Sequence, residues 1–388
     1  MFRHLQIYDR RERVLVGSAD LALAAAAPVA RAFRGRAAGP PKRILLMRIE
    51  RIGDLLMALD AIVDVAAAAP AAEIDLVVGS WNASLARAIP GVHRIETLDA
   101  AWLAREGEGL GIRQLLARAR TWRARRYDLA INFEPDIRSQ LLLAATGAAR
   151  LVGFSSGGGG PLLDVSLPFH PREPASDNAR RLVASVLDVP PRPETRLEIR
   201  ADARSRAREL LEGSRGPLVG VHASGGREIK QWPVERFADV AARLARDRDA
   251  TIVLSGSTAD KPLIDVMRTR LGSIRLVDVS GAIDLVTLAA VLERLDVFVT
   301  GDTGPMHLAA AVGTPVVAVF GPSDAARYAP RGNRHRVVRI DLPCSPCNRI
   351  RRPPARCVGH TPDCLSGIDV QRVFEAAELA LSAAVTTS

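Results

Sequence analysis

The chain has 388 residues, of which 48% are hydrophobic and 25% are charged. These proportions exclude a disordered or collagen-like chain, and the length predicts two domains of ordinary size. The formal net charge of +10 favours an anionic partner such as a nucleotide, nucleic acid or an anionic membrane, although a solvated basic surface explains it equally well. Aromatic residues make up only 4%, which argues against a surface that stacks nucleic-acid bases.

Residues 1–41 form a predicted N-terminal extension. The stretch from Val14 to Ala30 is mostly apolar, but Asp20 and Pro28 interrupt it and arginines flank both ends. It is short for a membrane span and lacks the cleavage pattern of a signal peptide. We expect a helix that either packs on the protein or lies on a membrane surface. Because no other segment is apolar enough to cross a bilayer, we expect a cytoplasmic protein.

Residues 42–200 alternate short apolar runs with longer amphipathic ones, which is typical of βαβ units. Predicted strands span residues 43–48, 73–78 and 127–133, and predicted helices span 53–69, 111–124, 137–145 and 175–187. The segment 153–174 is predicted as a mobile loop, because its glycine run lacks the Gly-Lys-Ser/Thr ending of a phosphate loop. We place the link between the domains near residues 190–215.

Residues 201–342 repeat this alternation more clearly. Predicted strands span residues 217–222, 251–255, 275–279, 296–300 and 315–320, and predicted helices span 233–246, 260–271, 284–294 and 305–312. Residues 343–388 then hold a cysteine-bearing segment and a predicted C-terminal helix. The predicted fold class is α/β, with two Rossmann-like, doubly wound parallel-sheet domains that face a cleft. In such sheets ligands bind at the carboxyl ends of the strands, so the residues that follow strands are the candidates for a site.

Asp54 follows the first predicted strand, directly after Gly53 and at the start of a predicted helix. One interpretation is that Asp54 only caps that helix. The other is that its carboxylate lies at the cleft and accepts a proton from a bound hydroxyl group. The position of Asp54 is compatible with both interpretations.

Ser224, Gly225 and Lys230 follow the first strand of the second predicted domain. A hydroxyl group and the backbone N–H groups of a glycine turn suit phosphate oxygens. The chain has only three lysines, so a lysine at this position suggests a site that uses a compact positive charge.

The segment Asp302-Thr303-Gly304-Pro305-Met306-His307 follows the strand predicted at 296–300. Pro305 is well placed as the first helical residue, with Thr303 or Gly304 as the cap. The N-terminus of a helix presents free N–H groups and a positive dipole end to the same point, which predicts an anion site between Asp302 and His307. The alternative is a capped helix with a buried histidine.

Cys344, Cys347, Cys357 and Cys364 are the only cysteines of the chain. Four thiolates in one short segment suit tetrahedral zinc or iron, and we expect such a metal to be structural. Reduced free thiols and disulfides are the alternatives.

Two other functional classes account for parts of the pattern. A dinucleotide-dependent oxidoreductase would share doubly wound domains, but no strand is followed by Gly-x-Gly-x-x-Gly with an acidic residue about 20 positions later. A basic, metal-bearing nucleic-acid-binding protein would explain the net charge and the arginines among the cysteines, and its DNA binding would fall steeply with salt. We expect neither class, and no nucleic-acid partner.

Four motifs together resemble those of glycosyltransferase family 9, the heptosyltransferases that use ADP-heptose and act on lipopolysaccharide. In chain order they are Arg48-x4-Gly53-Asp54, Lys230-x-Trp232-Pro233, Asp302-Thr303-Gly304-Pro305-Met306-His307 and Phe320-Gly321-Pro322. The resemblance covers roughly residues 42–375 and implies a GT-B fold, with the acceptor bound by the first domain and the nucleotide-sugar by the second.

The resemblance implies an inverting transfer that needs no metal or other cofactor for catalysis. Asp54 matches the family's proposed catalytic base, and Lys230 matches a lysine that contacts the diphosphate and the sugar. Thr303 and Gly304 match the diphosphate-binding turn, and Asp302 matches a residue oriented toward the transferred sugar. Ser224 matches hydroxyl residues near the phosphates. Many relatives carry a similar C-terminal cysteine stretch, which holds iron in some protein heptosyltransferases.

The expected activity is therefore transfer of a sugar, heptose from ADP-heptose, to a hydroxyl of a lipopolysaccharide core or another glycan or glycolipid acceptor. Closure of the two domains would bring base and donor site together and exclude water. A GT-B transferase that uses another nucleotide-sugar, or a protein or small-molecule acceptor, is the alternative.

Overall fold

The computed structural model describes residues 2–32, 34–35, 39–103 and 109–385. The chain divides into two compact units, Met1–Thr195 and Arg196–Ser388, each of which is described by itself. Our predicted boundary at 200/201 lies five residues after this division. Within the described ranges, no helix is long and apolar enough to cross a membrane.

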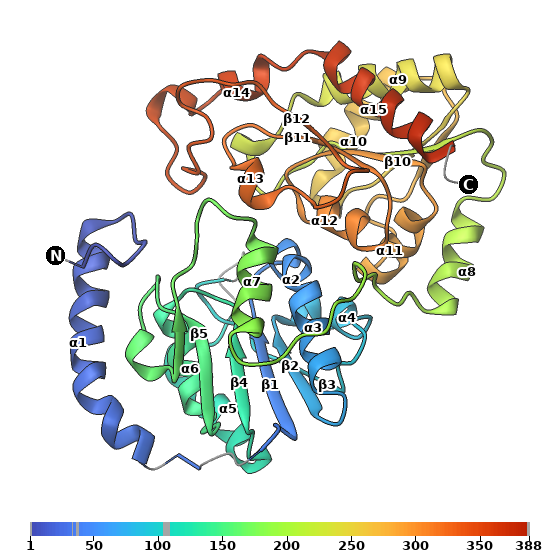
Figure 1. Ribbon diagram of the computed structural model, residues 1–388. Coiled ribbons are helices and arrows are strands. Elements are labelled where there is room, and N and C mark those ends of the chain that lie inside the picture. Colours follow the sequence, from blue (N-terminus) through green and yellow to red (C-terminus); the bar gives the residue numbers. More distant parts are fainter. Residues whose placement is uncertain (1, 33, 36–38, 104–108, 386–388) are drawn as a thin grey trace. The chain divides into compact units, whose positions relative to one another are not determined.

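The first unit is built on a parallel sheet of six strands. They are β1 (Arg43–Arg48), β2 (Glu73–Val78), β3 (Arg94–Thr97), β4 (Leu129–Asn132), β5 (Arg150–Phe154) and β6 (Val165–Leu167). Their spatial order is β3-β2-β1-β4-β5-β6 (Figure 1). Strands β1 and β4 are central and almost fully buried, which explains why their sequences are continuous apolar runs.

Helices connect these strands. They are α2 (Ile52–Met57), α3 (Leu59–Ala68), α4 (Ala83–Ala86), α5 (Ile112–Thr121), α6 (Ile137–Ala145) and α7 (Ala175–Ala184), with 3-10 turns η1 (Ser80–Asn82), η2 (Trp122–Arg125) and η3 (Gly160–Leu162). The single helix predicted over 53–69 is wrong. The chain breaks at Ala58, whose amide bonds to Leu55 O and so closes a tighter turn between α2 and α3.

The mobile loop predicted over 153–174 is also wrong. Strand β6 lies in this segment and pairs with β5 through Val152–Val165, Gly153–Ser166 and Phe154–Leu167. The glycines before it permit close packing rather than mobility: a Cβ on Gly159, at φ 81°, would lie 2.6 Å from Gln140 Cβ. The segment is therefore part of the folded first unit.

The second unit repeats the architecture. Its strands are β7 (Leu218–His222), β8 (Thr251–Leu254), β9 (Leu276–Asp278), β10 (Val297–Gly301), β11 (Val316–Val319) and β12 (Arg336–Val338). They are parallel and follow the order β12-β11-β10-β7-β8-β9. Its helices and 3-10 turns are α8 (Ala201–Leu210), η4 (Glu228–Lys230), α9 (Val234–Arg248), η5 (Thr258–Asp260), α10 (Lys261–Leu271), α11 (Leu285–Glu293), α12 (Gly304–Ala311), α13 (Ala325–Tyr328), η6 (Ala355–Cys357), α14 (Asp363–Ser366) and α15 (Val370–Val385).

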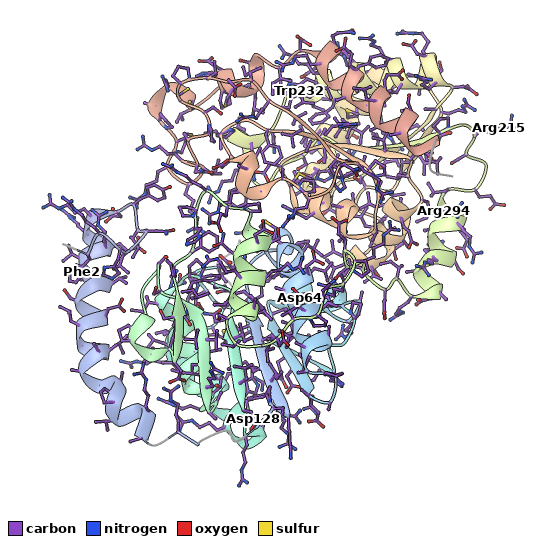
Figure 2. The ribbon with its side chains drawn as sticks, in the orientation of Figure 1. Phe2, Asp64, Asp128, Arg215, Trp232 and Arg294 are labelled. Carbon is purple, nitrogen blue, oxygen red and sulfur yellow. The ribbon has the colours of Figure 1, made fainter. Side chains whose placement is uncertain are left out.

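One aromatic pair anchors the core of the second unit. Trp232, which is labelled in Figure 2, is 1% exposed. It packs edge-on against Phe237 of α9, with 4.9 Å between the ring centroids. The indole N–H donates to Ile368 O just before α15, so the end of the chain is tied to the loop that carries Lys230. The Trp232-Pro233 motif therefore has a structural role of its own.

Both sheets have the strand order of a doubly wound fold, in which the chain starts at the centre, moves to one edge and returns to build the other half. The order reverses between β1 and β4 in the first unit and between β7 and β10 in the second. Each such point leaves a crevice at the carboxyl ends of the two strands, where ligands bind in these folds. The segments that follow β1, β4, β7 and β10 are therefore the positions to inspect for a site.

The N-terminal extension forms helix α1 (Arg10–Ala32), which packs on the first unit beside η3 (Figure 1). Asp20 accepts a hydrogen bond from the amide of Gly159 at 2.7 Å, and Arg31 donates to Pro161 O and Leu163 O. Packing on the protein, one of the two expected arrangements, is thereby confirmed for this face of the helix.

Candidate functional site

Strands β7 and β10 of the second unit place the predicted donor residues together. The two strands pair with Thr300 opposite His222, so their carboxyl ends lie side by side. Ser224 follows the end of β7 by two residues, and Asp302 and Thr303 follow directly on β10. The motifs that lie about 80 positions apart in sequence thus meet at one switch point.

Helix α12 begins at this point with a regular N-cap. Thr303 has an extended backbone, and its Oγ1 accepts the amide N–H of Met306 at 3.3 Å and contacts Thr300 Oγ1 at 3.2 Å. Pro305, the second residue of the helix, has no N–H to give. The amides that come first at this helix end, those of Thr303 and Gly304, are therefore the candidate donors to an anion.

Lys230 reaches the same place from the loop that follows β7. Its Nζ lies 2.5 Å from Asp302 Oδ2, and the two side chains are only 20% and 10% exposed. The loop also crosses the end of β10, since a Cβ on Gly301 would lie 3.6 Å from the carbonyl oxygen of Lys230. An ammonium group is thus held beside the start of α12, where the helix dipole is also positive.

Ser224 forms a hydrogen bond with Asp260, a residue that the sequence did not suggest. Its Oγ donates to Asp260 Oδ1 at 2.5 Å, and the other oxygen of Asp260 accepts from the amide and hydroxyl of Ser257. Burial pushes the pKa of Asp260 upward, but the hydrogen bonds from Ser224 and Ser257 outweigh it, and the pKa is lowered. The single hydroxyl proton of Ser224 is therefore committed to Asp260, and a phosphate oxygen would have to compete for it.

Two buried histidines border this switch point. His222 ends β7, and its Nδ1 lies 3.0 Å from Ser255 O. Burial lowers the pKa of His222 below its usual 6.5, so the ring is neutral at pH 7. His307 is 8% exposed and lies on α12, one turn after Gly304. The buried histidine that the sequence offered as the alternative is therefore present.

In the first unit, Arg48 at the end of β1 organises the corresponding switch point. It is 8% exposed, and its Nη1 donates to Phe133 O at 2.6 Å, just after β4. Its Nε donates to Asp54 O at 3.1 Å, and Nη1 lies 3.0 Å from Glu50 Oε2. One guanidinium therefore ties the ends of β1 and β4 to the start of α2.

Glu134 supports the same turn from β4 and was missed from the sequence. It is 2% exposed, and its Oε1 accepts the amides of Ile49 at 2.5 Å and Glu50 at 3.1 Å. Burial raises the pKa of Glu134 well above its usual 4.5, and the negative charge of Glu50 adds to this rise against the opposing charge of Arg48. No sequence motif marks this residue, because its partners lie 84 and 85 positions away.

Asp54 occupies the third position of α2. Its Oδ2 accepts the amide of Arg51 at 3.2 Å, so the capping contact expected as one alternative is present. Its Oδ1 lies 3.5 Å from Arg48 Nη2, and the side chain remains 29% exposed. The carboxylate is thus fixed at the carboxyl end of β1 and still open to solvent, which is compatible with the base role that stays a prediction.

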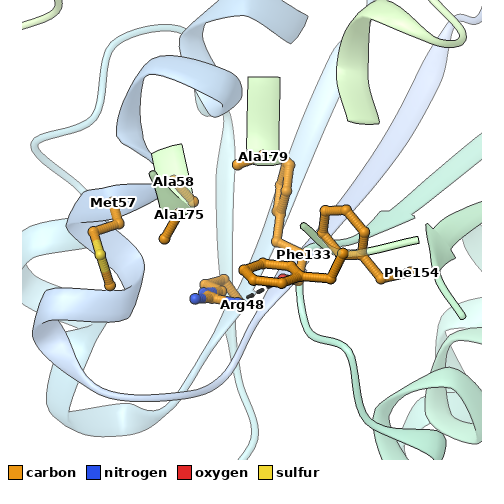
Figure 3. Close-up of a pocket in the computed structure, with 8 residues that line it drawn as sticks. Arg48, Met57, Ala58, Phe133, Phe154, Ala175 and Ala179 are labelled. Atoms are coloured by element: carbon orange, nitrogen blue, oxygen red, sulfur yellow. Dashed lines mark hydrogen bonds between the residues drawn. The ribbon is translucent and has the colours of Figure 1, made fainter. Parts of the chain in front are cut away.

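A pocket lies next to Arg48 inside the first unit. Figure 3 shows the guanidinium facing Phe133, with Met57 of α2 and Ala58, which follows that helix, on one side and Ala175 and Ala179 of α7 above. Phe154 and Phe169 complete a mainly apolar lining with one cation in it.

The four cysteines differ in their surroundings. Cys344 is exposed, Cys347 and Cys357 are half-buried, and Cys364 is buried, all as free thiols. Burial raises the pKa of the Cys364 thiol to about 11, and the other three thiols add to the rise. Within the described part of the chain, no three or more Cys, His, Asp or Glu side chains are arranged to hold a metal ion. The thiols as placed do not fit a metal, and the expected zinc or iron stays a prediction.

A model of glycosyltransferase family 9, described as heptosyltransferase, matches residues 115–355, which is more than half of the chain. The chain belongs to this family. It is therefore a glycosyltransferase, and the resemblance drawn from the four motifs is confirmed. The same finding favours a glycosyltransferase over the two other functional classes considered from the sequence.

Known proteins of the family resemble the chain over most of its length. The lipopolysaccharide core heptosyltransferase OpsX of Haemophilus influenzae is 25% identical over 305 residues, covering 77% of this chain and 85% of that protein. The family 9 glycosyltransferase structure from Veillonella parvula is 24% identical with a TM-score of 0.77, covering 90% of this chain and all of that one.

The structure of E. coli heptosyltransferase WaaC with ADP-2-deoxy-2-fluoro heptose has a TM-score of 0.61 at 22% identity, covering 77% of this chain and 93% of that one. These likenesses confirm the α/β, GT-B fold class with its two Rossmann-like sheets.

Proposed function

We propose that this glycosyltransferase transfers heptose from ADP-heptose to a hydroxyl of a lipopolysaccharide core acceptor. The family assignment supports the sugar, the WaaC complex with an ADP-heptose analogue supports the nucleotide, and the name of OpsX supports the acceptor. The observation that carries the proposal is the convergence of Lys230, Asp302 and the start of α12 at the β7–β10 switch point.

In this proposal the second unit binds the donor diphosphate. The ammonium of Lys230 and the amides of Thr303 and Gly304 face the oxygens that gain charge as the nucleotide leaves. Asp302 pairs with Lys230, and we propose that its carboxylate also accepts a hydrogen bond from a hydroxyl of the transferred sugar. Because Gly225 has no side chain, the backbone at this position can approach the donor phosphates closely. His307 and Ser224 line the same donor site.

The reaction we propose is a single displacement with inversion. The acceptor hydroxyl oxygen bonds to the anomeric carbon, the bond from that carbon to the phosphate oxygen breaks, and Asp54 takes the hydroxyl proton. ADP leaves with the electron pair of the broken bond. Because protein groups supply the positive charge at the leaving group, we propose that the transfer needs no metal ion.

We place this reaction at the cytoplasmic face of the inner membrane, where a glycolipid acceptor would be available. A different glycan, a protein or a small molecule remains the alternative acceptor, and another nucleotide-sugar remains the alternative donor.

Nucleotide preference tests the proposed donor. We expect ADP-heptose and ADP to raise the melting temperature of the full chain more than GDP- or UDP-sugars do. Lys230→Ala should weaken ADP binding about tenfold or more, because it removes a charge-assisted contact and leaves the Asp302 carboxylate facing the diphosphate. Lys261→Ala is the matched control, since Lys261 lies in the same unit on an exposed face and its ammonium pairs with Asp265, one turn further along α10.

Equal stabilisation by ADP-, GDP- and UDP-sugars would contradict the assignment of ADP-heptose. Unchanged ADP affinity in Lys230→Ala would remove Lys230 from the donor site. Loss of transfer after chelation, with recovery on adding a divalent ion, would overturn the metal-independent part of the proposal.

A further inference from the structure

Helix α1 packs on the first unit through one face and leaves a second, apolar face exposed to solvent. The inner face holds both kinds of side chain: Ala27 is buried and Val16 is half-buried, while Asp20 bonds to the amide of Gly159 and Arg31 to Pro161 O and Leu163 O. A helix that packs on a soluble domain normally has one apolar stripe, which it buries. The second, exposed apolar face of α1 is therefore not explained by packing on the first unit.

The outward face carries a continuous apolar stripe, formed by Val14, Leu15, Leu21 and Val29. These side chains are 40%, 71%, 62% and 62% exposed. Val14 and Leu21 are seven residues apart, and Leu15 and Val29 are fourteen apart, so all four lie on one side of the helix. The positions between them on this side hold Ser18 and small alanines. At 1.5 Å per residue the stripe is about 22 Å long.

The N-terminal segment that carries this stripe is basic. Residues 1–42 contain eight basic and three acidic residues, so this ninth of the chain carries half of its net charge of +10. Arg3, Arg10 and Arg11 are exposed at the N-terminal end of the helix, and Tyr8 beside them is 90% exposed. Asp20 is turned inward, and Arg31 and Arg34 also bond to the first unit, so the exposed basic residues that can meet a partner are those at the N-terminal end.

We propose that the apolar stripe of α1 is a docking surface for an anionic lipid bilayer. The leucines and valines would enter the boundary between headgroups and acyl chains, and the arginines would meet lipid phosphates. Helix α1 would lie in the plane of the interface, in keeping with the finding that no described helix can span a membrane. The inner face, held by Asp20 and Arg31, would keep the catalytic units attached to it.

Charge decides between a bilayer and a second copy of the chain as the occupant. Pairing two α1 helices through their stripes would bring two segments of the same strongly positive charge together, which opposes association. An anionic bilayer offers both an apolar layer and the opposite charge. The proposal therefore commits to lipid.

Vesicle sedimentation with the full chain tests the proposal. We expect binding to vesicles of phosphatidylcholine with phosphatidylglycerol, weak binding to phosphatidylcholine alone, and a loss of binding at high salt. The double variant Leu15→Ser/Leu21→Ser should reduce partitioning onto anionic vesicles by about tenfold or more, because it removes two apolar anchors. Arg10→Gln/Arg11→Gln should weaken the anionic preference specifically.

Leu379→Ser is the matched control, because Leu379 on α15 is 60% exposed, as Leu21 is, but lies outside the basic extension. It should bind vesicles as the unaltered chain does. Melting temperatures of all variants show that folding is retained. Unchanged vesicle binding by the double leucine variant overturns the proposal. If, in addition, the unaltered chain is a dimer and this variant is a monomer, the stripe instead pairs two copies of the chain. Donor affinity measured in parallel keeps this outcome separate from failure of the proposed transfer reaction.

Discussion

Glu134 is held in a setting that stabilises its neutral form. Its carboxyl group is buried, faces the charge of Glu50, and accepts two backbone amides that shape the turn between β1 and α2. The carbonyl oxygen of the neutral acid also accepts such bonds, although less strongly than a carboxylate oxygen does, and the neutral acid avoids the cost of a buried charge.

The raised pKa of Glu134 makes stability depend on pH. A group whose pKa is higher in the folded than in the unfolded chain contributes stability below its unfolded value near 4.5, and this contribution falls as pH rises through the folded value. We expect Glu134→Gln, which mimics the neutral acid, to gain stability relative to the unaltered chain as pH rises from about 4.5. Urea denaturation across this range measures the difference.

Glu134→Ala serves as the comparison for that experiment. It leaves two buried amides without an acceptor and should lower the free energy of unfolding by about 2–4 kcal/mol. If the difference in the free energy of unfolding between Glu134→Gln and the unaltered chain is the same at every pH, the raised pKa of Glu134 is contradicted.

Residues in contiguous motifs could be predicted from the sequence, whereas their partners could not. Asp302, Thr303 and Lys230 were found because a strand, a glycine turn and a helix start follow one another in a recognisable order. Glu134 and Asp260 act on residues far away in the chain, through contacts that only the folded sheets create. Long-range partners of this kind have no local signal.

At the scale of elements, the start of α12 combines three features in one turn. Thr303 caps the helix, and Pro305 fixes the backbone of its first turn. Lys230 forms an ion pair with Asp302, the residue before Thr303, and so lies beside the start of the helix. The cap and the proposed anion site use the same backbone, so we expect a change in the cap to alter anion binding as well as helix stability.

Thr303→Ala should therefore affect both stability and donor binding. We expect a loss of about 1 kcal/mol in the free energy of unfolding from the missing cap, with weaker ADP binding because the amides of the first turn are less fixed. Thr303→Ser keeps the hydroxyl and should restore both. Urea denaturation and calorimetric titration with ADP measure the two effects, and normal ADP affinity in Thr303→Ala would argue against this turn as the diphosphate site.

Elements with a clear apolar period were predicted closely, and elements defined by packing were not. The strands over 43–48 and 73–78 and the helix over 137–145 agree with the structure residue for residue. Strand β6 was missed because Val165–Leu167 is short, half-buried and preceded by glycines that resemble a loop. Helix α8 was missed because it is rich in arginine and lies where the link between domains was expected.

At the scale of the whole molecule, the two units share one topology but differ in what their switch points carry. The first unit presents a carboxylate, Asp54, positioned by an arginine, whereas the second presents an ammonium and a helix N-terminus. A transfer between an acceptor hydroxyl and a nucleotide-sugar needs one of each. From the sequence, this division of roles could be predicted only through the family resemblance. Two units with the same topology do not themselves show which one binds the donor and which one binds the acceptor.

The most direct test of this account separates transfer from donor binding in Asp54→Asn. This variant keeps the shape and the contact to the Arg51 amide but cannot take up the acceptor proton at pH 7. We predict that kcat for heptosyl transfer falls by about a hundredfold or more while the affinity for ADP-heptose, measured by calorimetry, stays within about twofold of the unaltered chain. Transfer at the normal rate by a folded Asp54→Asn variant would contradict the account.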